Sequence, residues 1–475
     1  MPASSLLPRN PWCSPTSSAD MGERRAPARV RDMTEGSPLR LILAFAVPLF
    51  IGNIFQQVYS MVDTMVVGYH LGDSAIAAIG ATSSLYSLVI NFAGGLNNGY
   101  GIVVTQRFGS HNRKEMKQAI AGMMLLDVVV TLLLTVLSLT FLRPLMGFMN
   151  TPDALFDQSY AYISVICGGM LATMGYNMFA SILRAMGNSR SPLYFLILSC
   201  LLNIVLDVLF VVVFEWGISG AAIATVLAQL VSAISCGIFV LSNYREFLPG
   251  REDFQVPMSM ISTLLSTGFS MALMSSLVDG GSVIFQRANN VLGETFITAH
   301  AASRKILMIM LQPQATIAVA TSTFVGQNWG AKNADRVQTG LKRSLGLELA
   351  WGLLGTALVW LFGSGLVRFT TGTSDPKIIQ SAVLSLRIHF SMFPFLGVLF
   401  CLRNAMQAMG QKLVPVLSSC IELAMKILSA NLLIPNLGFL GTCITEPITW
   451  VLMVLFLTVV YLHRRKTLFA ALQTA

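Results

Sequence analysis

The sequence predicts an all-α integral membrane protein of about twelve transmembrane helices, arranged in two six-helix lobes related by a pseudo-two-fold axis along the membrane normal. Three observations predict this class: an apolar composition, long apolar segments and an internal duplication. Of the 475 residues, 54% are hydrophobic and only 11% are charged, whereas a soluble protein carries about 25% charged residues. Such a chain buries its helices in lipid, where every backbone polar group has to be paired within the protein.

Apolar runs of about 20 residues recur along the chain, and each is long enough to cross a hydrocarbon core about 30 Å thick. They do not alternate apolar and polar residues, as the strands of a membrane barrel would. We expect helices over these approximate spans: 41–67, 75–104, 117–141, 155–184, 191–214, 219–242, 259–290, 295–325, 340–365, 377–405, 412–434 and 439–462.

The duplication relates the two halves of the chain at a shift of 221 residues. The pattern Gln106, Phe108, Gly109 and Asn112 returns as Gln327, Trp329, Gly330 and Asn333, and Leu71-Gly72 returns as Leu292-Gly293. A related pair, Ala185-Met186-Gly187 and Ala408-Met409-Gly410, matches at a shift of 223. Six helices per half is an even number, so both halves enter the membrane in the same orientation and their axis runs along the membrane normal. A duplicated apolar chain is typical of a transporter whose site lies between its halves.

The chain divides at its most charged internal stretch. Residues 245–258 hold two prolines and are interpreted as a cytoplasmic linker, which separates an N-terminal lobe, 39–244, from a C-terminal lobe, 259–463. Residues 1–38 are rich in Pro, Ser and Arg and lack the apolar segment of a signal peptide, so they are predicted to be a disordered cytoplasmic tail. Residues 464–475 are predicted to be a second cytoplasmic tail.

Basic residues gather on one side of the predicted topology. Arg107, Arg184, Arg245 and many others lie in one set of loops, whereas the opposite loops hold only three. This asymmetry predicts that both termini face the cytoplasm of a cell whose inner, or plasma, membrane holds the protein. The same distribution accounts for the net charge of +9, so nucleic acid is not an expected partner.

Carboxylates within such spans are costly, so they are the first candidates for function. Asp63 lies late in the first predicted helix and Asp207 late in the fifth, where Asn203 is four residues earlier and shares its face. Thr225 begins the sixth helix at similar depth. These oxygens suit a hard cation such as Na⁺, and two neighbouring carboxylates could instead share a proton. The alternative is structural: Asp63 is hydrated near the interface or hydrogen-bonded by Ser60 or Thr64, and Asp207 is tied only to Asn203.

Further candidates lie along the cleft expected between the lobes. Pro48 interrupts the first helix and acts either as a moving hinge or as a static bend. Gln56 on the same helix, together with Asp279 and Glu446, is assigned to the substrate cavity, where either acid could bind a cationic substrate or a proton.

Other charged and reactive residues have simpler interpretations. Glu422 and Lys426 are four residues apart and should neutralise each other, and His389 is expected to be packed. The seven cysteines show no metal-ligand spacing. No Walker A, HExxH or GxSxG motif is present, so neither ATP-driven transport nor enzyme activity is expected, and no cofactor beyond a coupling ion.

These residues resemble the multidrug and toxic compound extrusion (MATE) family, prokaryotic type, from about Leu41 to Leu462. The motifs that carry the resemblance are Pro48 with Val62-Asp63-Thr64, Gln106-Arg107-Phe108-Gly109, Leu183-Arg184-Ala185-Met186-Gly187-Asn188, Asn203 with Asp207, and Val325-Gly326-Gln327-Asn328-Trp329-Gly330-Ala331. The resemblance implies a secondary active antiporter that exports organic, often cationic, compounds in exchange for Na⁺ or H⁺ by alternating access. It implies membrane lipid as surroundings, and we expect a monomer.

The resemblance also implies residue roles. The family's branch related to the DNA-damage-inducible protein F has a first-lobe cation site whose residues correspond to Asp63, Asn203, Asp207 and Thr225. Its helix-1 proline, thought to bend with protonation, corresponds to Pro48. An asparagine of helix 4 that lines the same cavity corresponds to Asn177. The norfloxacin-exporting branch uses second-lobe acids; Asp279 is near its helix-7 acid, and its helix-10 acid has no counterpart here.

Two other function classes fit the sequence less well. The alternative is a lipid-linked oligosaccharide or lipid flippase of the same superfamily. Such flippases tend to line their cleft with basic residues and to exceed twelve helices, whereas the intramembrane charges of this chain's first lobe are mostly acidic and about twelve helices are expected. A membrane enzyme or receptor would need a nucleophile or metal constellation, and a duplication is not expected of it.

Overall fold

The computed structural model describes residues 30–149, 151–373 and 375–474, which fold into helices without a β strand among them. The first half forms α1 (Pro38–Leu71), α2 (Asp73–Gly109), α3 (Arg113–Phe148), α4 (Asp153–Gly168), α5 (Met170–Ala185), α6 (Arg190–Asp207), η1 (Val208–Val213) and α7 (Gly217–Asn243). The second half forms α8 (Met258–Asn289), η4 (Asn290–Leu292), α9 (Glu294–Gly330), α10 (Ala334–Thr371), α11 (Pro376–Ser391), α12 (Phe393–Ala408), α13 (Leu413–Leu428), η5 (Ser429–Leu433), α14 (Ile434–Leu437) and α15 (Phe439–Thr474).

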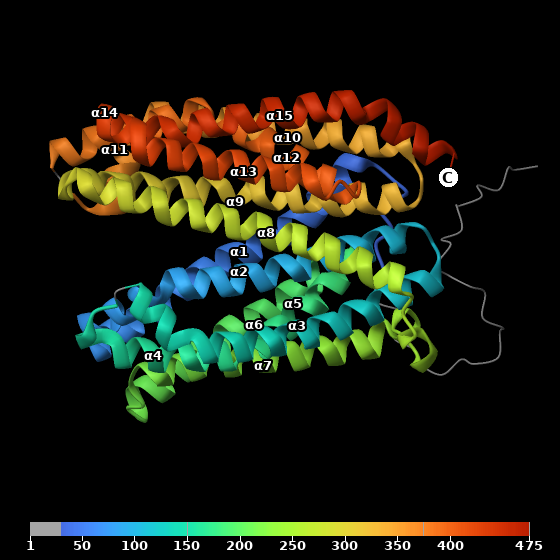
Figure 1. Ribbon diagram of the computed structural model, residues 1–475, viewed down its shortest axis with the longest axis horizontal. Coiled ribbons are helices and arrows are strands. Elements are labelled where there is room, and N and C mark those ends of the chain that lie inside the picture. Colours follow the sequence, from blue (N-terminus) through green and yellow to red (C-terminus); the bar gives the residue numbers. More distant parts are fainter. Residues whose placement is uncertain (1–29, 150, 374, 475) are drawn as a thin grey trace, which may run out of the picture.

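Ten helices of the described ranges are long and apolar enough to cross a membrane, or twelve if each of two bent pairs counts as one span. The predicted all-α membrane fold is therefore confirmed. Figure 1 shows the two halves as separate layers of helices, with α1, α2, α8 and α9 between them. Each half has its own large apolar core, and α2 lies against both α8 and α9 of the other half.

The fourth and tenth predicted helices are not continuous, which corrects the expected spans 155–184 and 377–405. The pair α4 and α5 bends by 43° at Gly169, and α11 and α12 bend by 48° at Met392. Pro394 lacks an N–H, so the carbonyl four residues earlier loses its helical partner. Thr356 of α10 replaces that partner by donating its hydroxyl to the Phe390 carbonyl at 2.5 Å.

The repeated motif residues build the same turns in both halves. Asn112 caps the start of α3 by accepting from the Glu115 amide at 3.2 Å, and Asn333 caps α10 by accepting from the Arg336 amide at 3.1 Å. Gly72 and Gly293 both adopt a positive φ in the turns that begin α2 and α9, a conformation that favours glycine. The helices that run from these turns are therefore placed alike in both lobes.

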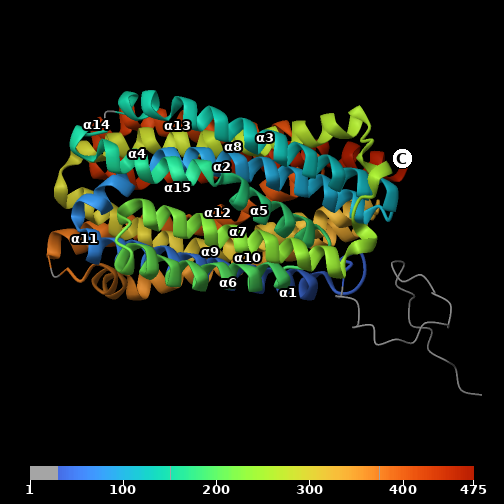
Figure 2. The ribbon, with the colours of Figure 1, turned by 90° about the horizontal axis from the view of Figure 1, so that it is seen from below.

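The linker and both ends of the described chain lie at one end of the molecule, which we call the linker end (Figures 1 and 2). The linker contains two short 3-10 helices, η2 (Arg245–Phe247) and η3 (Arg251–Phe254). Phe247 is buried and packs its ring against Phe108 and Tyr244. The linker is therefore attached to the first lobe.

Residues 30–37, which we call the strap, differ from the disordered tail expected over 1–38. The Met33 side chain is fully buried beside α1 and α9, and its backbone amide and carbonyl are bonded to Gln327 and Asn328. These partners are nearly 300 residues away in sequence, which is why composition alone predicted disorder. Residues 1–29 lie outside the described residues. At the other terminus, residues 464–474 of the predicted second tail continue α15 as a helix.

Candidate functional site

The two copies of the repeated motif meet face to face at the linker end, where α2 and α9 finish. A Cβ on Gly109 would lie 1.9 Å from the Gln327 carbonyl oxygen, and a Cβ on Gly330 would lie 1.9 Å from the Gln106 carbonyl oxygen. Only glycine allows this approach of two backbones. We call this contact between 106–110 and 327–330 the closure.

Hydrogen bonds across the lobes reinforce the closure and follow the repeat. Gln106 donates its amide to the Ala408 carbonyl of the second lobe, and Gln327 donates its amide to the Ala185 carbonyl of the first lobe, both at 2.8 Å. Ala185 and Ala408 belong to the second repeated pair of motifs. Each bond therefore joins the glutamine motif of one lobe to the Ala-Met-Gly motif of the other lobe. The motifs recognised in the sequence are thus the parts that hold the lobes together at the linker end.

The strap spans the same seam. Its Arg31 amide donates to the Met186 carbonyl in the first lobe at 3.2 Å. In the second lobe, the Gln327 side chain accepts from the Met33 amide at 2.8 Å, and Arg336 donates to the Met33 carbonyl at 2.9 Å. The strap therefore ties both lobes together beside the closure.

The predicted first-lobe acids lie together inside the N-terminal lobe, toward the end opposite the linker. Asp207 is fully buried at the end of α6, Asn203 is 1% exposed and Asp63 is half-buried on α1. The Asp63 and Asp207 carboxylates lie within hydrogen-bonding reach of each other. One oxygen of each, Oδ1, has no hydrogen-bond partner. The pair therefore consists of one half-buried and one fully buried acid, which face each other and have spare acceptor atoms.

Asn203 connects this pair to α7. The side-chain amide of Asn203 is assigned with its nitrogen toward Asp207. In the opposite orientation the amide oxygen would face only acceptors and the nitrogen only donors. In the assigned orientation Asn203 donates to Asp207 Oδ2 at 2.9 Å and accepts from the Thr225 backbone amide at 3.2 Å. The Thr225 hydroxyl donates to the Ala221 carbonyl at 3.1 Å. All four predicted residues therefore lie in one network, with Thr225 joined through its backbone.

Sequence reasoning missed three tyrosines that surround Asp63. Tyr59, Tyr86 and Tyr162 come from α1, α2 and α4 and interact electrostatically with its carboxyl group. Tyr59 is four residues before Asp63, a helical spacing that could have indicated it. The other two come from helices whose register relative to α1 only the structure gives. Phenolic hydroxyls can donate to a carboxylate or help to hold a cation.

The backbone beside Asp207 is also unusual. The helix changes to π-helical geometry over Val208–Val213, directly after the acid, and the second lobe does the same over Ser429–Leu433, after Leu428. Leu428 occupies the position that the 221-residue shift assigns to Asp207. Single π-helical turns are frequent at functional sites. Both lobes therefore have the same frame, and only the first places an acid in it.

The other predicted residues lie outside this network. Pro48 is buried in α1, which continues as one helix from Pro38 to Leu71, so its hinge role stays a prediction. Gln56 is exposed and Asn177 is half-buried, and their place in a substrate cavity also stays a prediction. Asp279 of α8 accepts from the Asn91 side chain of α2 at 2.9 Å, so it does face the other lobe.

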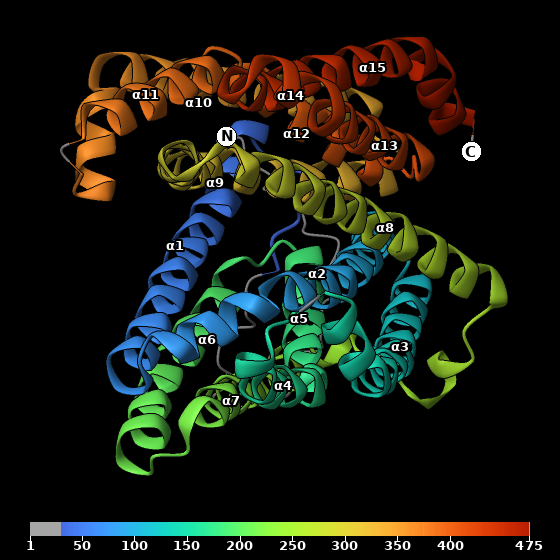
Figure 3. The same ribbon diagram turned by 60° about the vertical axis from the view of Figure 1, so that its left-hand side comes forward.

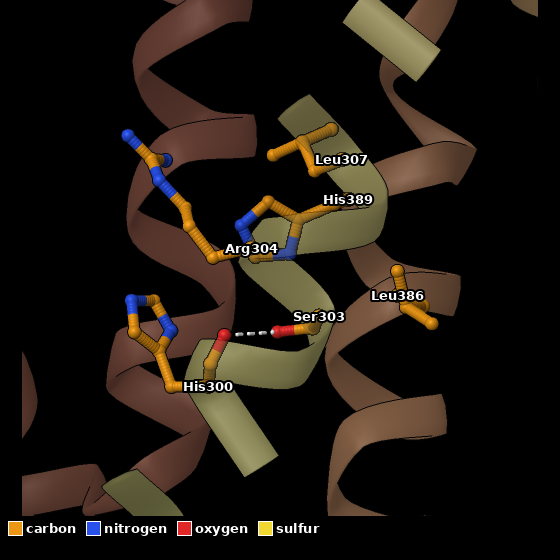
Figure 4. Close-up of a pocket in the computed structure, with 6 residues that line it drawn as sticks. All are labelled: His300, Ser303, Arg304, Leu307, Leu386 and His389. Atoms are coloured by element: carbon orange, nitrogen blue, oxygen red, sulfur yellow. Dashed lines mark hydrogen bonds between the residues drawn. The ribbon is translucent and has the colours of Figure 1, made fainter. Parts of the chain in front are cut away.

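Glu446 does not offer the free carboxylate that was expected in the cleft. It is 8% exposed and pairs with Arg304 of α9, while His389 Nε2 lies 3.6 Å from its other oxygen. Arg304 and His389 also border a narrow gap between α9 and α11 that has no room for water (Figure 4). The Glu446 carboxylate therefore belongs to a packed ion pair of the second lobe, and its place in a substrate cavity stays a prediction.

Three more charges of the second lobe are also paired with one another. Lys426 Nζ lies 3.0 Å from Glu422 Oε1, as predicted, and Arg403 Nη2 lies 3.7 Å from the other oxygen of the same carboxylate. His389 is 4% exposed, so its expected packing is confirmed. The second lobe thus neutralises these charges internally.

A cavity with both polar and apolar lining lies between the lobes just beyond the closure. Its polar lining comes from both lobes, with Asn98, Thr105, Ser181 and Arg184 on one side and Ser322, Thr323 and Asn404 on the other. Figure 3 shows α8 and α9 lying between α2 and α5 of the first lobe and α12 of the second. The closure therefore seals one end of a space between the lobes.

Comparison with known proteins gives consistent matches over most of the chain. The MatE family model matches residues 48–209 and 270–431, one segment in each lobe. The "Probable multidrug resistance protein YpnP" of Bacillus subtilis is 27% identical over 382 residues, which cover 80% of this chain and 85% of that protein. The "Probable multidrug resistance protein NorM" of Thermotoga maritima is 24% identical over 395 residues, covering 80% and 82%.

Solved structures resemble the whole fold. One is described as an "Outward-facing conformation of a multidrug resistance MATE family transporter of the MOP superfamily". It superposes with a TM-score of 0.85 at 20% identity and covers 94% of this chain and 99% of its own. At this identity the likeness shows the shared architecture alone.

Proposed function

This chain belongs to the MatE family of membrane transporters, and we propose that it is a multidrug efflux antiporter that exchanges organic, often cationic, compounds for Na⁺ or H⁺. Curated relatives with the words multidrug resistance in their names support the substrate class. The observation that carries ion coupling is the buried pair Asp63 and Asp207, whose oxygens face each other and retain unpaired acceptor atoms.

The acid pair suits a coupling ion for electrostatic reasons. Two carboxylates side by side in a low-dielectric interior repel each other when both are ionised, so a proton or a monovalent cation between them relieves the repulsion. Asn203 fixes Asp207, and the tyrosines around Asp63 supply further polar groups. An ion bound there can drive transport only if it binds one conformation of the lobes better than the other.

We assign the closure to one of the two conformations that alternating access requires. The excess of basic residues in the loops supports assigning the linker end to the cytoplasm of the plasma (inner) membrane. The structure would then be the state that is closed toward the cytoplasm. In the opposite state, the motifs at 106–110 and 327–330 separate and the cavity beyond them receives the substrate. The ion arrives from outside when the first lobe is open there, and its binding favours the return.

Transport in proteoliposomes tests this function. The purified protein is reconstituted, and uptake of a labelled cationic dye is followed with a Na⁺ gradient and an H⁺ gradient imposed separately. We expect one gradient to drive uptake, and Asp63→Asn and Asp207→Asn to reduce that uptake to the level of empty vesicles. Asp153→Asn, an exposed acid at the same end of the molecule, is the matched control and should transport normally.

The outcomes separate the parts of the proposal. Uptake that responds to neither gradient would overturn the antiport. Gradient-driven uptake at the wild-type rate in both aspartate variants would overturn the site while leaving the antiport in place.

A further inference from the structure

Two further buried acids occupy equivalent positions in the two lobes. Asp127 on α3 and Glu348 on α10 are 221 residues apart, the shift that relates the repeated motifs. Asp127 is 4% exposed and Glu348 is fully buried. Neither belongs to the acid pair at Asp63 and Asp207, and among the described residues no Lys, Arg or His forms an ion pair with either carboxyl group. The duplication has therefore kept one unpaired acid inside each lobe.

In the first lobe, Asp127 meets an amide from the central helix α2. Asn97 donates to Asp127 Oδ1 at 2.8 Å and also to the Met174 carbonyl of α5 at 3.3 Å. The Asn97 side chain is 1% exposed, and its oxygen has no partner. Tyr100, one turn along α2, is the titratable group that faces Asp127, and its hydroxyl is also unpaired.

The second lobe has a similar arrangement, shifted by one helical turn, in which no hydrogen bond joins the amide to the acid. Gln314 of α9 donates to the Phe393 carbonyl of α12 at 3.3 Å, as Asn97 does to the carbonyl of α5. A Cβ on Gly397 would lie 2.8 Å from Gln314 Nε2 and 3.0 Å from Glu348 Oε2, so the glycine leaves the space that the acid occupies. Cys401 of α12 is the titratable group that faces Glu348.

The unsatisfied atoms at the two sites have the same character. Asn97 Oδ1, Gln314 Oε1 and both carboxylate oxygens of Glu348 are buried acceptors without a donor. Buried polar atoms are almost always paired, and an isolated carboxylate charge in an apolar interior is strongly disfavoured. One proton on each carboxyl group removes the charge and supplies the missing donor. A proton also needs no coordination shell, which suits a side chain with no exposed surface.

From this geometry we propose that Asp127 and Glu348 are proton-binding sites, one in each lobe, additional to the Asp63 and Asp207 pair. Both sites lie close to the bends of the broken helices. Met174 follows the bend at Gly169 by about one turn, and Phe393 directly follows the bend at Met392. Loss of the proton would leave a buried negative charge against these segments, so the protonation state is linked to the bent conformation of α4–α5 and α11–α12.

Infrared difference spectroscopy of the purified full-length protein tests the sites without requiring transport. A protonated carboxyl group gives a C=O stretch that shifts in D₂O and disappears when the group ionises. We expect such bands in the Asp63→Asn/Asp207→Asn double variant, in which the proposed coupling pair is removed. Adding Glu348→Gln should remove one band and adding Asp127→Asn another, whereas Glu252→Gln, an exposed acid of the linker, should change none.

The absence of any protonated-carboxyl band in the double variant would overturn the proposal, and so would bands that persist unchanged after both further substitutions. If the proteins with added substitutions do not fold, the double variant alone can still overturn the proposal, because it must show protonated-carboxyl bands. Whether these protons take part in transport rests on the proposed antiport. The role of these protons in transport is tested separately, and we expect Glu348→Gln to lose H⁺-driven dye uptake. If the protein proves not to be an antiporter, the infrared result is unaffected.

Discussion

Adding one methyl group at the closure should shift the protein away from the conformation described here. In Gly109→Ala, the new Cβ would lie 1.9 Å from the Gln327 carbonyl oxygen, whereas such contacts are essentially never shorter than 3.0 Å. The backbones of α2 and α9 therefore have to separate by about 1 Å. Overpacking of this kind costs about 2 kcal/mol, which corresponds to a roughly 30-fold change in the ratio of closed to open molecules. In the open state the two motifs are apart, and the methyl group costs nothing there.

The assay measures the distance between the lobes at the linker end. Spin labels at Lys114 and Asp335, which are exposed equivalent positions at the starts of α3 and α10, report that distance by double electron–electron resonance. We expect one short distance in the parent protein and an added longer population in Gly109→Ala. Gly94→Ala on the same helix is the control, because its Cβ would meet nothing within 4 Å and it gains the same helix propensity. An unchanged distance distribution in Gly109→Ala would refute the close packing of the two motifs.

Three other predictions concern the strap, the second-lobe ion pair and the repeated caps. Asn328→Ala removes a hydrogen bond to the Met33 carbonyl, so trypsin should cut within the strap several-fold faster, and an unaltered rate would contradict its anchoring. Arg304→Gln leaves the buried Glu446 carboxylate with only His389 beside it and should lower the stability by about 3 kcal/mol in thermal unfolding. Adding Glu446→Gln should restore most of that stability, and a lack of rescue would exclude the ion pair as the cause. Asn112→Ala removes the cap of α3 and should cost about 1 kcal/mol in the same measurement, whereas an unchanged melting temperature would show that the cap contributes little.

The first-lobe site could be predicted because its signals are local in sequence. Asn203 and Asp207 lie one helical turn apart, and acids within apolar spans are few. The sequence was misleading for Glu446, since its partner Arg304 is 142 residues away and no local pattern relates them. Asp127 and Glu348 were overlooked, although the 221-residue shift that relates the motifs also relates these two acids. The halves therefore share more than turns and packing: they also share one buried acid each.

The sequence by itself determined the helices, their number, the division into two lobes and the residues of the first-lobe acid pair. These follow from apolar length, helical spacing and repetition, which the order of residues contains. Only the tertiary structure decided which groups meet. The fit of Gly109 against Gln327, the strap bound at Met33 and the pairing of Arg304 with Glu446 depend on how helices distant in sequence are placed. The physical reason is that hydrogen bonds and ion pairs act over a few ångströms, so a lone acid in the sequence becomes paired or unpaired only when the lobes pack.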